Sequence, residues 1–293
     1  MAYLGIDIGG TFIKYGIVDS KEIINKGKVL TPKDNYDNFI KEIKNIILEN
    51  CSDIKGIGIS VPGKVNSKTG LIQHGGALAY LHNKNLKDEI KRIIDLPIYI
   101  ENDGKAATLA EHLYGNLKGV NNGGAIILGT GVGSGYILDG VLRRGEHFQS
   151  GEISFIVQDN KLQGEQSFVA YKASAVLLIN ELANILGVEP DGREVFSIIA
   201  KSPDALIRLN NYSKNIALLI YNIQAILDLD CYVIGGGISA QSLLIESINK
   251  AYDDIYNASS IISETLSRPR IIQAKYREDA NLIGATWNLK EEK

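Results

Sequence analysis

Two glycine-rich stretches, each placed directly after an apolar segment, have residue types that suit phosphate binding. They are DIGGT, residues 7–11, and LGTGVGSG, residues 128–135. Glycine has no Cβ, so backbone N–H groups can approach phosphate oxygens closely at such positions. Each stretch alone is equally compatible with an ordinary tight turn. Together they predict a phosphate site that comprises Asp7, Gly9, Gly10, Thr11, Gly129, Thr130, Gly131 and Gly133.

Asp7 comes before the first glycine pair, at the expected end of a strand. Mg²⁺ prefers a small number of carboxylates together with water and phosphate oxygens, so we expect Asp7 to hold a hydrated Mg²⁺. Lys14 lies on the strand that follows the turn. It either approaches the phosphates or is solvated, and both interpretations stay open.

Two other nucleotide-binding motifs are not met. The chain has no GxxxxGK[ST] sequence, which excludes a P-loop. The stretch GGGISA, residues 235–240, lies between an expected strand and an expected helix, as in a dinucleotide-binding fold. About 20 residues later such a fold needs a strand that ends in an acidic residue, but residues 251–257 have a helical pattern. The sequence therefore disfavours a dinucleotide cofactor.

Asn102 and Asp103 end the apolar stretch LPIYIEND, residues 96–103, and a helix of small residues follows them. Asp is a common helix N-cap, so Asp103 can have a purely structural role. A carboxylate at the carboxyl end of a strand also lies where open α/β sheets bind ligands. There it can accept the proton of an attacking hydroxyl. From these residues alone, both roles remain open.

Strands that alternate with helices must position these residues. Apolar residues at helical spacing predict helices over 36–50, 104–115, 167–187, 204–230 and 278–290, and Ser239 is expected to cap a helix that follows it. Between them, apolar runs that end in glycine turns predict strands, and this alternation predicts an α/β fold with mostly parallel sheets. Since the two strand–glycine–strand hairpins are far apart in sequence, we expect two similar halves that meet near residues 115–122.

Composition predicts a soluble, cytoplasmic globular protein. The 293 residues are 45% hydrophobic and 22% charged, with a formal net charge of −3 and no basic block that would attract nucleic acid. Cys51 and Cys231 form no CxxC pair, so we expect neither a disulfide framework nor a cysteine zinc site, as suits a reducing compartment. The N-terminus lacks the pattern of a signal peptide, and no apolar run is long enough to predict a membrane span.

In their order along the chain, the motifs resemble those of the ROK family (repressors, open reading frames and sugar kinases) in the actin-like ATPase superfamily. The resemblance is carried by DIGGTFIK, ISVPGKVNSKTGLI, ENDGKAATLAE, LGTGVGSGYILDGVLRRG, SGEIS and VIGGGIS. It implies a homodimer of chains with two actin-like (ribonuclease H-like) α/β domains and a cleft between them. Residues 1–117 and 276–293 would form the N-terminal domain, to which the final helix returns, and residues 118–275 the C-terminal domain.

The same resemblance implies roles for individual residues. ATP, with Mg²⁺, would span both glycine hairpins, and its adenosine would lie near Gly236 and Gly237. A sugar would be bound by Gly63, Asn102, Asp103 and Glu152. Asp103 matches the family's catalytic base, which would accept the proton of the sugar's 6-hydroxyl. Glu152, beside the apolar run ISFIV, is thus expected to bind the sugar rather than to lie at a solvated strand edge.

One motif departs from the family pattern. Most family sugar kinases read GEIGH, followed by a loop of clustered cysteines; the His and three Cys bind zinc, and a further Glu contacts the sugar near its anomeric oxygen. This chain reads GEISF, so Phe155 replaces the His, the loop has no cysteine, and Ala170 falls where that Glu would be, with Glu165 nearby but off register. The scattered histidines give no metal-ligand spacing, and we expect no zinc. They are His74, His82, His112 and His147.

Phe155 also bears on the identity of the sugar. A site without polar groups at the C1 end of the sugar no longer demands a free hydroxyl there. An apolar surface at C1 suits a substituted anomeric carbon, and the chain is similar to the branch of the family that phosphorylates β-glucosides such as cellobiose. Alternatively, Phe155 only packs a loop that has no zinc, and the acceptor is a free hexose or N-acetylhexosamine, such as glucose or N-acetylmannosamine.

Two non-enzymatic functions are less compatible with the sequence. Regulators of the family carry a helix-turn-helix domain before the first glycine motif, and here that motif begins near residue 4, so we do not expect a regulator. A non-catalytic, sugar-sensing protein would not need Asp103 or the two glycine hairpins, which are both intact.

Overall fold

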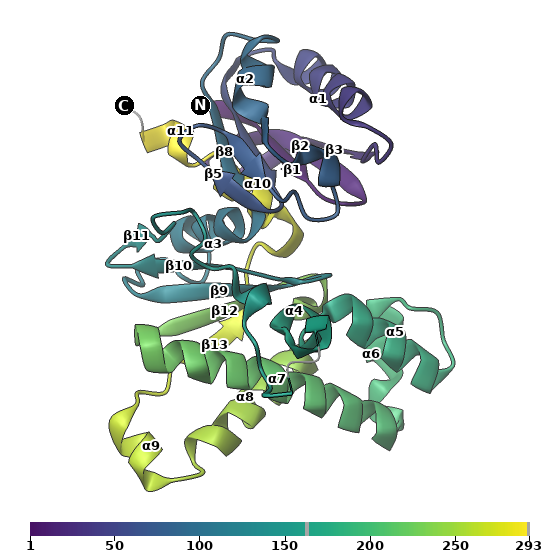
Figure 1. The fold of residues 1–293 in the computed structure, drawn as a ribbon, viewed down its shortest axis with the longest axis vertical. Coiled ribbons are helices and arrows are strands. Elements are labelled where there is room, and N and C mark those ends of the chain that lie inside the picture. Colours follow the sequence, from purple (N-terminus) through teal and green to yellow (C-terminus); the bar gives the residue numbers. More distant parts are fainter. Residues whose placement is uncertain (162–163, 292–293) are drawn as a thin grey trace. The chain divides into compact units, whose positions relative to one another are not determined.

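The computed structural model describes residues 1–161 and 164–291, and its fold is α/β, as predicted (Figure 1). The chain forms two compact units. Unit 1 comprises Met1–Tyr114, Leu142–Ser150 and the described C-terminal residues from Asp279 onward. Unit 2 comprises Gly115–Val141 and Gly151–Glu278. Each unit is therefore assembled from segments that are separated in the sequence.

Unit 1 is built around a five-stranded sheet with the strand order β3-β2-β1-β4-β8. The first three strands form an antiparallel meander, whereas β4 pairs with β1, and β8 with β4, in parallel. The carboxyl ends of β1, β4 and β8 therefore meet at one edge of the sheet. The strands are β1 (Ala2–Ile8), β2 (Phe12–Asp19), β3 (Glu22–Leu30), β4 (Ile54–Val61) and β8 (Ile98–Asn102).

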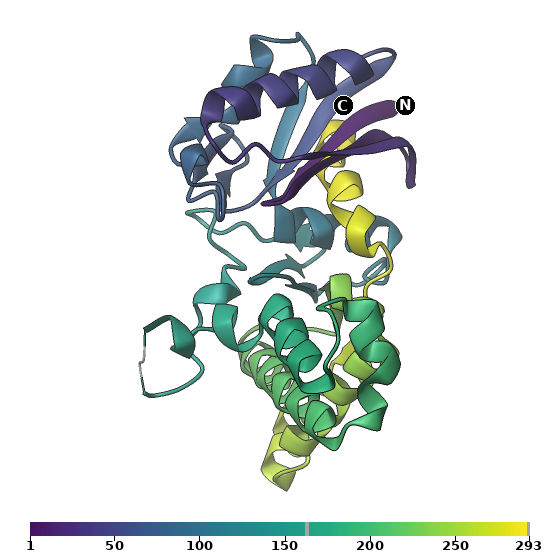
Figure 2. The same ribbon diagram turned by 90° about the vertical axis from the view of Figure 1, so that its right-hand side faces the viewer.

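Helices cover both faces of this sheet (Figure 2). The apolar face of α1 is buried in the same cluster as Leu4, Ile6 and Ile8 of β1, while α10 packs against β1 and α3. The predicted helix over 36–50 is confirmed as α1. A small sheet, β5-β6-β7, comes between β4 and β8 in the sequence. These elements are α1 (Tyr36–Asn50), β5 (Lys64–Asn66), β6 (Leu71–Gln73), β7 (Lys84–Asn85), α2 (Leu86–Lys91), α3 (Asp103–Tyr114), α10 (Ala280–Ala285) and α11 (Asn288–Glu291).

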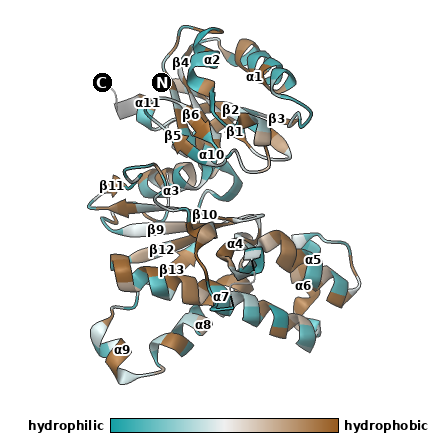
Figure 3. Ribbon diagram, viewed as in Figure 1, coloured by the Kyte–Doolittle hydropathy of each residue, from teal (hydrophilic) through white to brown (hydrophobic). Residues whose placement is uncertain are grey.

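Unit 2 repeats the same sheet with the order β11-β10-β9-β12-β13. Here β9 and β10 are antiparallel, and β12 pairs in parallel with β9 and β13. Hydrophobic residues are concentrated on β12 and on parts of α5 and α7, and these elements enclose the core of unit 2 (Figure 3). The elements are β9 (Gly123–Leu128), β10 (Val132–Leu138), β11 (Val141–Leu142), α4 (Val169–Lys172), α5 (Ala175–Leu186), α6 (Gly192–Ile198), α7 (Pro203–Leu227), β12 (Cys231–Gly236), α8 (Ser242–Tyr256), α9 (Ser260–Thr265) and β13 (Arg270–Gln273).

Three local predictions are wrong. The final helix expected over 278–290 is divided into α10 and α11, and in the other two cases a serine side chain is involved. The single helix expected over 167–187 is divided into α4 and α5, because Ser174 caps α5 by accepting a hydrogen bond from the N–H of Leu177 at 3.2 Å. Ser239 does not cap α8. It lies in a 3₁₀ turn, and its hydroxyl donates to the carbonyl of Gly236 at 2.8 Å.

One segment, Val169–Leu186, is long and apolar enough to cross a membrane when only length and composition are counted. It is interrupted at Ser174, between α4 and α5. Its residues Val169, Leu178 and Leu182 are buried in the core of unit 2. The core helices of soluble proteins meet the same criterion, and this packing is of that kind.

Candidate active site

Asp103 lies where β8 ends and α3 begins in unit 1. Its Oδ1 accepts hydrogen bonds from the N–H of Gly104 at 2.8 Å and from the Nδ2 of Asn102 at 2.9 Å. The first of these bonds is a local turn contact, as expected of a residue at a helix start. The two donors fix the orientation of the carboxylate, and an ionised carboxylate is a group that can accept a proton.

Asn102 connects the ends of two neighbouring strands and is only 7% exposed. Besides its bond to Asp103, its Nδ2 donates to the carbonyl of Gly63, just after β4, at 3.0 Å. Its Oδ1 accepts from the N–H of Lys105 at 3.1 Å. Both amide hydrogens are thus engaged within the protein, and only acceptor capacity on Oδ1 is left for a ligand.

A buried ion pair that was not predicted from the sequence lies next to Asn102 and Asp103. Glu101 is fully buried and accepts hydrogen bonds from the hydroxyl of Tyr99 at 2.7 Å and the Nε of Arg144 at 2.9 Å. The N–H of Asn102 donates to the same carboxylate at 3.1 Å. Burial and the Glu101 charge raise the pKa of Tyr99, so the phenol stays protonated and remains a donor.

The first glycine hairpin, residues 9–11, closes through a hydrogen bond from the N–H of Gly9 to the carbonyl of Phe12 at 3.0 Å. Thr31 supports it, because its hydroxyl donates to the carbonyl of Gly9 at 2.7 Å. Among the described residues, no backbone carbonyl accepts a hydrogen bond from the N–H groups of Gly10 and Thr11. These two donors are therefore available to an anion.

Asp7 is half-buried beside this hairpin and accepts a hydrogen bond from the Nδ2 of Asn281, on α10, at 2.9 Å. Burial raises the pKa of Asp7, and the Asn281 amide, the Ser60 hydroxyl and the charge of Lys14 only partly oppose that rise. Lys14 pairs directly with Asp7 in the register of β1 and β2. A carboxylate with a raised pKa gains from a nearby cation, which is the setting expected of a metal-holding Asp.

The second hairpin, residues 129–131 in unit 2, closes in a similar way. The N–H of Gly129 donates to the carbonyl of Gly131 at 3.0 Å, and within the described part of the chain no backbone carbonyl accepts from the N–H groups of Thr130 and Gly131. Gly133 lies further along β10, where it pairs with Ile127 in the ladder rather than in the turn. This hairpin therefore presents backbone donors without any charged side chain.

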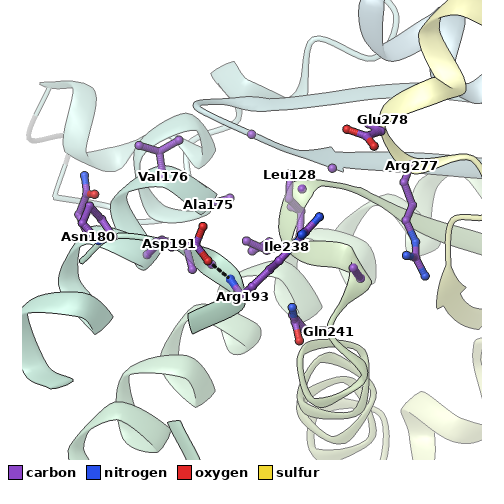
Figure 4. Close-up of a pocket in the computed structure, with 17 residues that line it drawn as sticks. Leu128, Ala175, Val176, Asn180, Asp191, Arg193, Ile238, Gln241, Arg277 and Glu278 are labelled. Carbon is purple, nitrogen blue, oxygen red and sulfur yellow. Dashed lines mark hydrogen bonds between the residues drawn. The ribbon is translucent and has the colours of Figure 1, made fainter. Parts of the chain in front are cut away.

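A cavity of about 500 Å³ in unit 2 begins at this hairpin (Figure 4). Three of the predicted residues, Gly129, Gly236 and Gly237, line it, whereas Thr130, Gly131 and Gly133 do not. Residues that were not predicted as site residues complete its wall. Leu128, Ile238 and Ala240 lie within the glycine motifs LGTGVGSG and GGGISA, whereas most of the others come from helices or loops remote in sequence and carry no local motif. The residues that were not predicted are Leu128, Ala175, Val176, Ile179, Asn180, Pro190, Asp191, Gly192, Arg193, Ile238, Ala240, Gln241, Arg277 and Glu278.

The two glycines at the end of β12 have different structural roles. A Cβ on Gly236, which has a φ of +94°, would lie 2.0 Å from the carbonyl oxygen of Leu128, so this glycine is required for packing against β9. A Cβ on Gly237 would meet no atom within 4 Å. Gly237 therefore leaves open space at the wall of the cavity, as a ligand that approaches the backbone closely requires.

Arg193 is the cationic side chain on the α6 side of the cavity, and Figure 4 shows it extending across the cavity floor toward Ile238. Asp191 precedes it and caps α6, since its Oδ1 accepts from the N–H groups of Arg193 at 2.8 Å and Glu194 at 3.0 Å. These bonds lower the pKa of Asp191 and hold the turn that begins α6.

Glu152 follows Gly151 in unit 2 and is half-buried at the start of a short 3₁₀ turn, Ile153–Phe155. Phe155 is 69% exposed, and its ring meets that of Phe168 edge to face, with the centroids 6.5 Å apart. Within residues 1–161 and 164–291, no group of three or more His, Cys, Asp or Glu side chains could hold a metal ion. The segment after Glu152 thus presents an aromatic surface to solvent.

Sequence similarity to known proteins extends over the whole chain. The sequence model of the ROK family matches residues 3–292. The chain is 30% identical over 300 residues to a beta-glucoside kinase of Listeria innocua, with 100% of this chain and 98% of that protein covered. It is 29% identical over 302 residues to an N-acetylmannosamine kinase of Vibrio cholerae, with coverage of 99% and 100%.

The fold is similar to that of solved structures as well. The crystal structure of a ROK family protein from Streptococcus pneumoniae TIGR4 in complex with sucrose matches with a TM-score of 0.86 and 29% sequence identity. The match covers 100% of this chain and 99% of that chain. The similarity therefore includes both units and is not limited to one of them.

Proposed function

This chain belongs to the ROK family and is an ATP-dependent sugar kinase with two actin-like domains, and we propose that it phosphorylates the 6-hydroxyl of a β-glucoside such as cellobiose. The comparisons support the family and the kinase activity, whereas the identity of the sugar acceptor is the proposal. The observation that carries the acceptor proposal is the exposed Phe155, which lies two positions beyond Ile153 in the glutamate motif. Its ring packs edge to face on that of Phe168.

We propose that the cavity of unit 2 binds the adenosine of ATP and that the adjoining hairpin binds its phosphates. The open space at Gly237 supports the first assignment, because a nucleoside needs close access to the cavity wall. The N–H groups of Thr130 and Gly131 support the second. They are donors of the kind that cradle phosphate oxygens.

The residues around Asp7 fit a hydrated Mg²⁺. The carboxylate is half-buried, its orientation is fixed by Asn281, and burial raises its pKa in spite of the Asn281 and Ser60 hydrogen bonds, which lower it. When bound, Mg²⁺ neutralises charge on the phosphate oxygens. Asp7 and Asn281 would orient its water ligands, and the Gly10 and Thr11 N–H groups would bind phosphate directly.

Asp103 is the proposed base. Its carboxylate, oriented by Gly104 and Asn102, accepts the proton of the sugar's 6-hydroxyl while that oxygen forms its bond to the terminal phosphorus and ADP leaves. Asn102 holds Asp103 in place and offers its Oδ1 to a sugar hydroxyl, with Gly63 as its backbone support. Glu152 is the proposed ligand of a further ring hydroxyl.

The acceptor proposal rests on aromatic surface rather than on polar groups. A pyranose ring has an apolar face that stacks on aromatic side chains, and Phe155 and Phe168 offer such a surface beside Glu152. The beta-glucoside kinase of Listeria innocua and the sucrose complex of the Streptococcus pneumoniae protein agree with a two-ring acceptor. The N-acetylmannosamine kinase of Vibrio cholerae favours a free N-acetylhexosamine as the second candidate.

The test is a panel of acceptors that differ at C1. Phosphorylation of glucose, N-acetylmannosamine, methyl β-glucoside, cellobiose and gentiobiose is followed by ADP formation. We expect cellobiose to exceed glucose in kcat/KM by about tenfold, in the range that apolar contacts supply. Phe155→Ala should remove most of that preference and leave the kcat/KM for glucose nearly unchanged. Activity restricted to free monosaccharides contradicts the β-glucoside proposal but not the kinase activity.

A further inference from the structure

The segment that carries Glu152 is fastened to strand β10 by two serine side chains, and all of these residues belong to unit 2. The hydroxyl of Ser134 donates to the carbonyl of Gly151 at 2.9 Å. The hydroxyl of Ser154 accepts from the N–H of Val132 at 3.0 Å and donates to the carbonyl of the same residue at 3.0 Å. Glu152 therefore lies between two fixed points, one residue before it and two residues after it.

The backbone at Gly151 is fitted to this arrangement. Gly151 has a φ of +90°, and a Cβ there would lie 2.6 Å from the carbonyl oxygen of Ser134. No residue other than glycine could bring the chain so close to β10 in this conformation. After it, the N–H of Ile153 donates to the carbonyl of Gly151 at 2.8 Å, and the Ile153 side chain is buried in the core. The turn around Glu152 thus has one well-defined conformation.

Val132, the partner of Ser154, is also the first residue of β10 after the second glycine hairpin. It pairs with Leu128, the last residue of β9, and these two residues close the loop formed by residues 129–131. A Cβ on Gly131 would lie 3.2 Å from the Ser154 hydroxyl oxygen, so the serine side chain packs against the hairpin itself. Any displacement of Glu152 would therefore have to break bonds at the base of the phosphate-binding loop.

We propose that Ser154, together with Ser134, is a positioning residue that fixes the sugar ligand Glu152 relative to the hairpin that binds the phosphates of ATP. The inference rests on the proposed function of both groups. In the GEIGH pattern a glycine, which has no hydroxyl, stands at the position of Ser154, so this link belongs to the present chain rather than to the motif. It acts through side-chain hydrogen bonds and needs no metal ion.

The expected effect is on catalysis more than on stability. Phosphoryl transfer depends on the geometry of hydroxyl and phosphate, and a displacement of about 1 Å can cost 10²-fold in rate. Loss of the Ser154 hydroxyl also leaves the backbone N–H and C=O of Val132 without the hydroxyl that they bind, which weakens the attachment of the turn that carries Glu152. We therefore expect Ser154→Ala to raise the KM for the sugar and to lower kcat, each by about five- to tenfold, with the Kd for ATP within about twofold of wild type.

The experiment compares Ser154→Ala with a rescue variant and a matched control. Ser154→Thr keeps the hydroxyl and should return kcat and the sugar KM to within about twofold of wild type. Ser213→Ala removes a buried serine of α7 whose Oγ has no hydrogen-bond partner among the described residues, and it should leave both parameters unchanged. If Ser154→Ala lowers only the melting temperature, with kcat and KM as in wild type, Ser154 is merely structural and the proposal is wrong.

Two further outcomes are decisive. If Ser154→Ala does not yield folded protein, Ser134→Ala, which removes the bond to Gly151 and keeps those of Ser154, should raise the sugar KM in the same direction. An unchanged sugar KM in that variant overturns the proposal. If the wild-type enzyme phosphorylates no sugar of the panel, the proposed acceptors themselves are wrong and the positioning role is lost with them. The wild-type measurement therefore separates the two failures.

Discussion

The two five-stranded sheets have the same strand order, but the ends of corresponding strands differ in charge. In unit 1, the penultimate residue of β1 is Asp7, which faces Lys14 across the hairpin, and β8 leads into Asp103. In unit 2, the penultimate residue of β9 is Ile127, which faces Gly133, and β13, the counterpart of β8, ends in Gln273. One scaffold thus presents carboxylates at these strand ends, whereas its repeat presents uncharged side chains and backbone.

This difference separates two tasks within one fold. Ionised side chains can move protons and hold a cation, but they carry a desolvation cost, which is visible in the raised pKa of Asp7. Backbone donors and open space can hold a large anionic ligand without such a cost. We therefore expect substitutions at the strand ends of unit 1 to lower kcat, and substitutions at those of unit 2 to raise the KM for ATP.

The largest effect is expected from Asp103→Ala. Loss of the base should reduce kcat by about 10²–10⁴, the range typical of general-base catalysis, while the protein stays folded. A steady-state assay and a thermal melt measure the two properties. Asp37→Ala, which removes an exposed Asp from the first turn of α1, is the matched control and should leave kcat unchanged. Wild-type turnover in Asp103→Ala would contradict the assignment of the base.

Asp7→Asn is expected to lower activity by about 10–100-fold, the range seen when a group that orients a metal's ligands is lost. The same change should stabilise the ligand-free protein. Because the folded-state pKa of Asp7 lies above its unfolded value, folding favours the protonated form, and stability falls as pH rises through the folded pKa.

Asp7→Asn has no charge at this position. Its gain in stability over wild type should therefore be fully present at neutral pH and should vanish below the pKa of Asp7 in the unfolded chain. A gain of about 1 kcal/mol in the free energy of unfolding would raise the melting temperature by roughly 2–4 °C. Thermal melts at pH 7 and at progressively lower pH, without nucleotide or Mg²⁺, measure the difference in melting temperature between Asp7→Asn and wild type. A variant that is less stable than wild type at neutral pH would show that the Asp7 charge is already compensated by Asn281 and Lys14.

The smallest effect is expected in unit 2, from Gly237→Val. The new side chain enters open space at the wall of the cavity, so it should raise the KM for ATP by about tenfold, as the loss of apolar contact and access implies, and leave kcat within twofold. Gly236→Val is the contrasting variant, since its Cβ collides with the Leu128 carbonyl and should prevent folding. If Gly237→Val lowers kcat instead, the division of tasks between the units does not hold.

The α/β fold and the kinase family were predictable from the sequence because their signals are local. The glycine hairpins, the apolar strands and the IEND strand end each lie within one short stretch. The roles of Asp7, Asp103 and Glu152 stay predictions. The ion pair of Glu101 with Arg144 was not predictable, because its residues are 43 positions apart and only the folded chain brings them together. The same holds for Asn180, Arg193 and Gln241 at the cavity.

The break between α4 and α5 had a different cause. The apolar pattern continues through Ser174, so periodicity alone predicts one helix, and only the capping bond to Leu177 ends the first segment and begins the second. Side-chain capping competes with helix continuation by a small free energy, which a pattern of apolar residues does not record.

The place of α10 has a consequence for biosynthesis. This helix packs against β1 and α3, and its Asn281 binds Asp7, so β1 is completed by a residue that is made 274 positions later in the chain. Unit 2, which ends at Glu278, has its full sequence before unit 1 does. Until the ribosome releases α10, one face of the β1–β4 pair lacks its cover, and the polypeptide can have the complete cavity of unit 2 before unit 1 is complete.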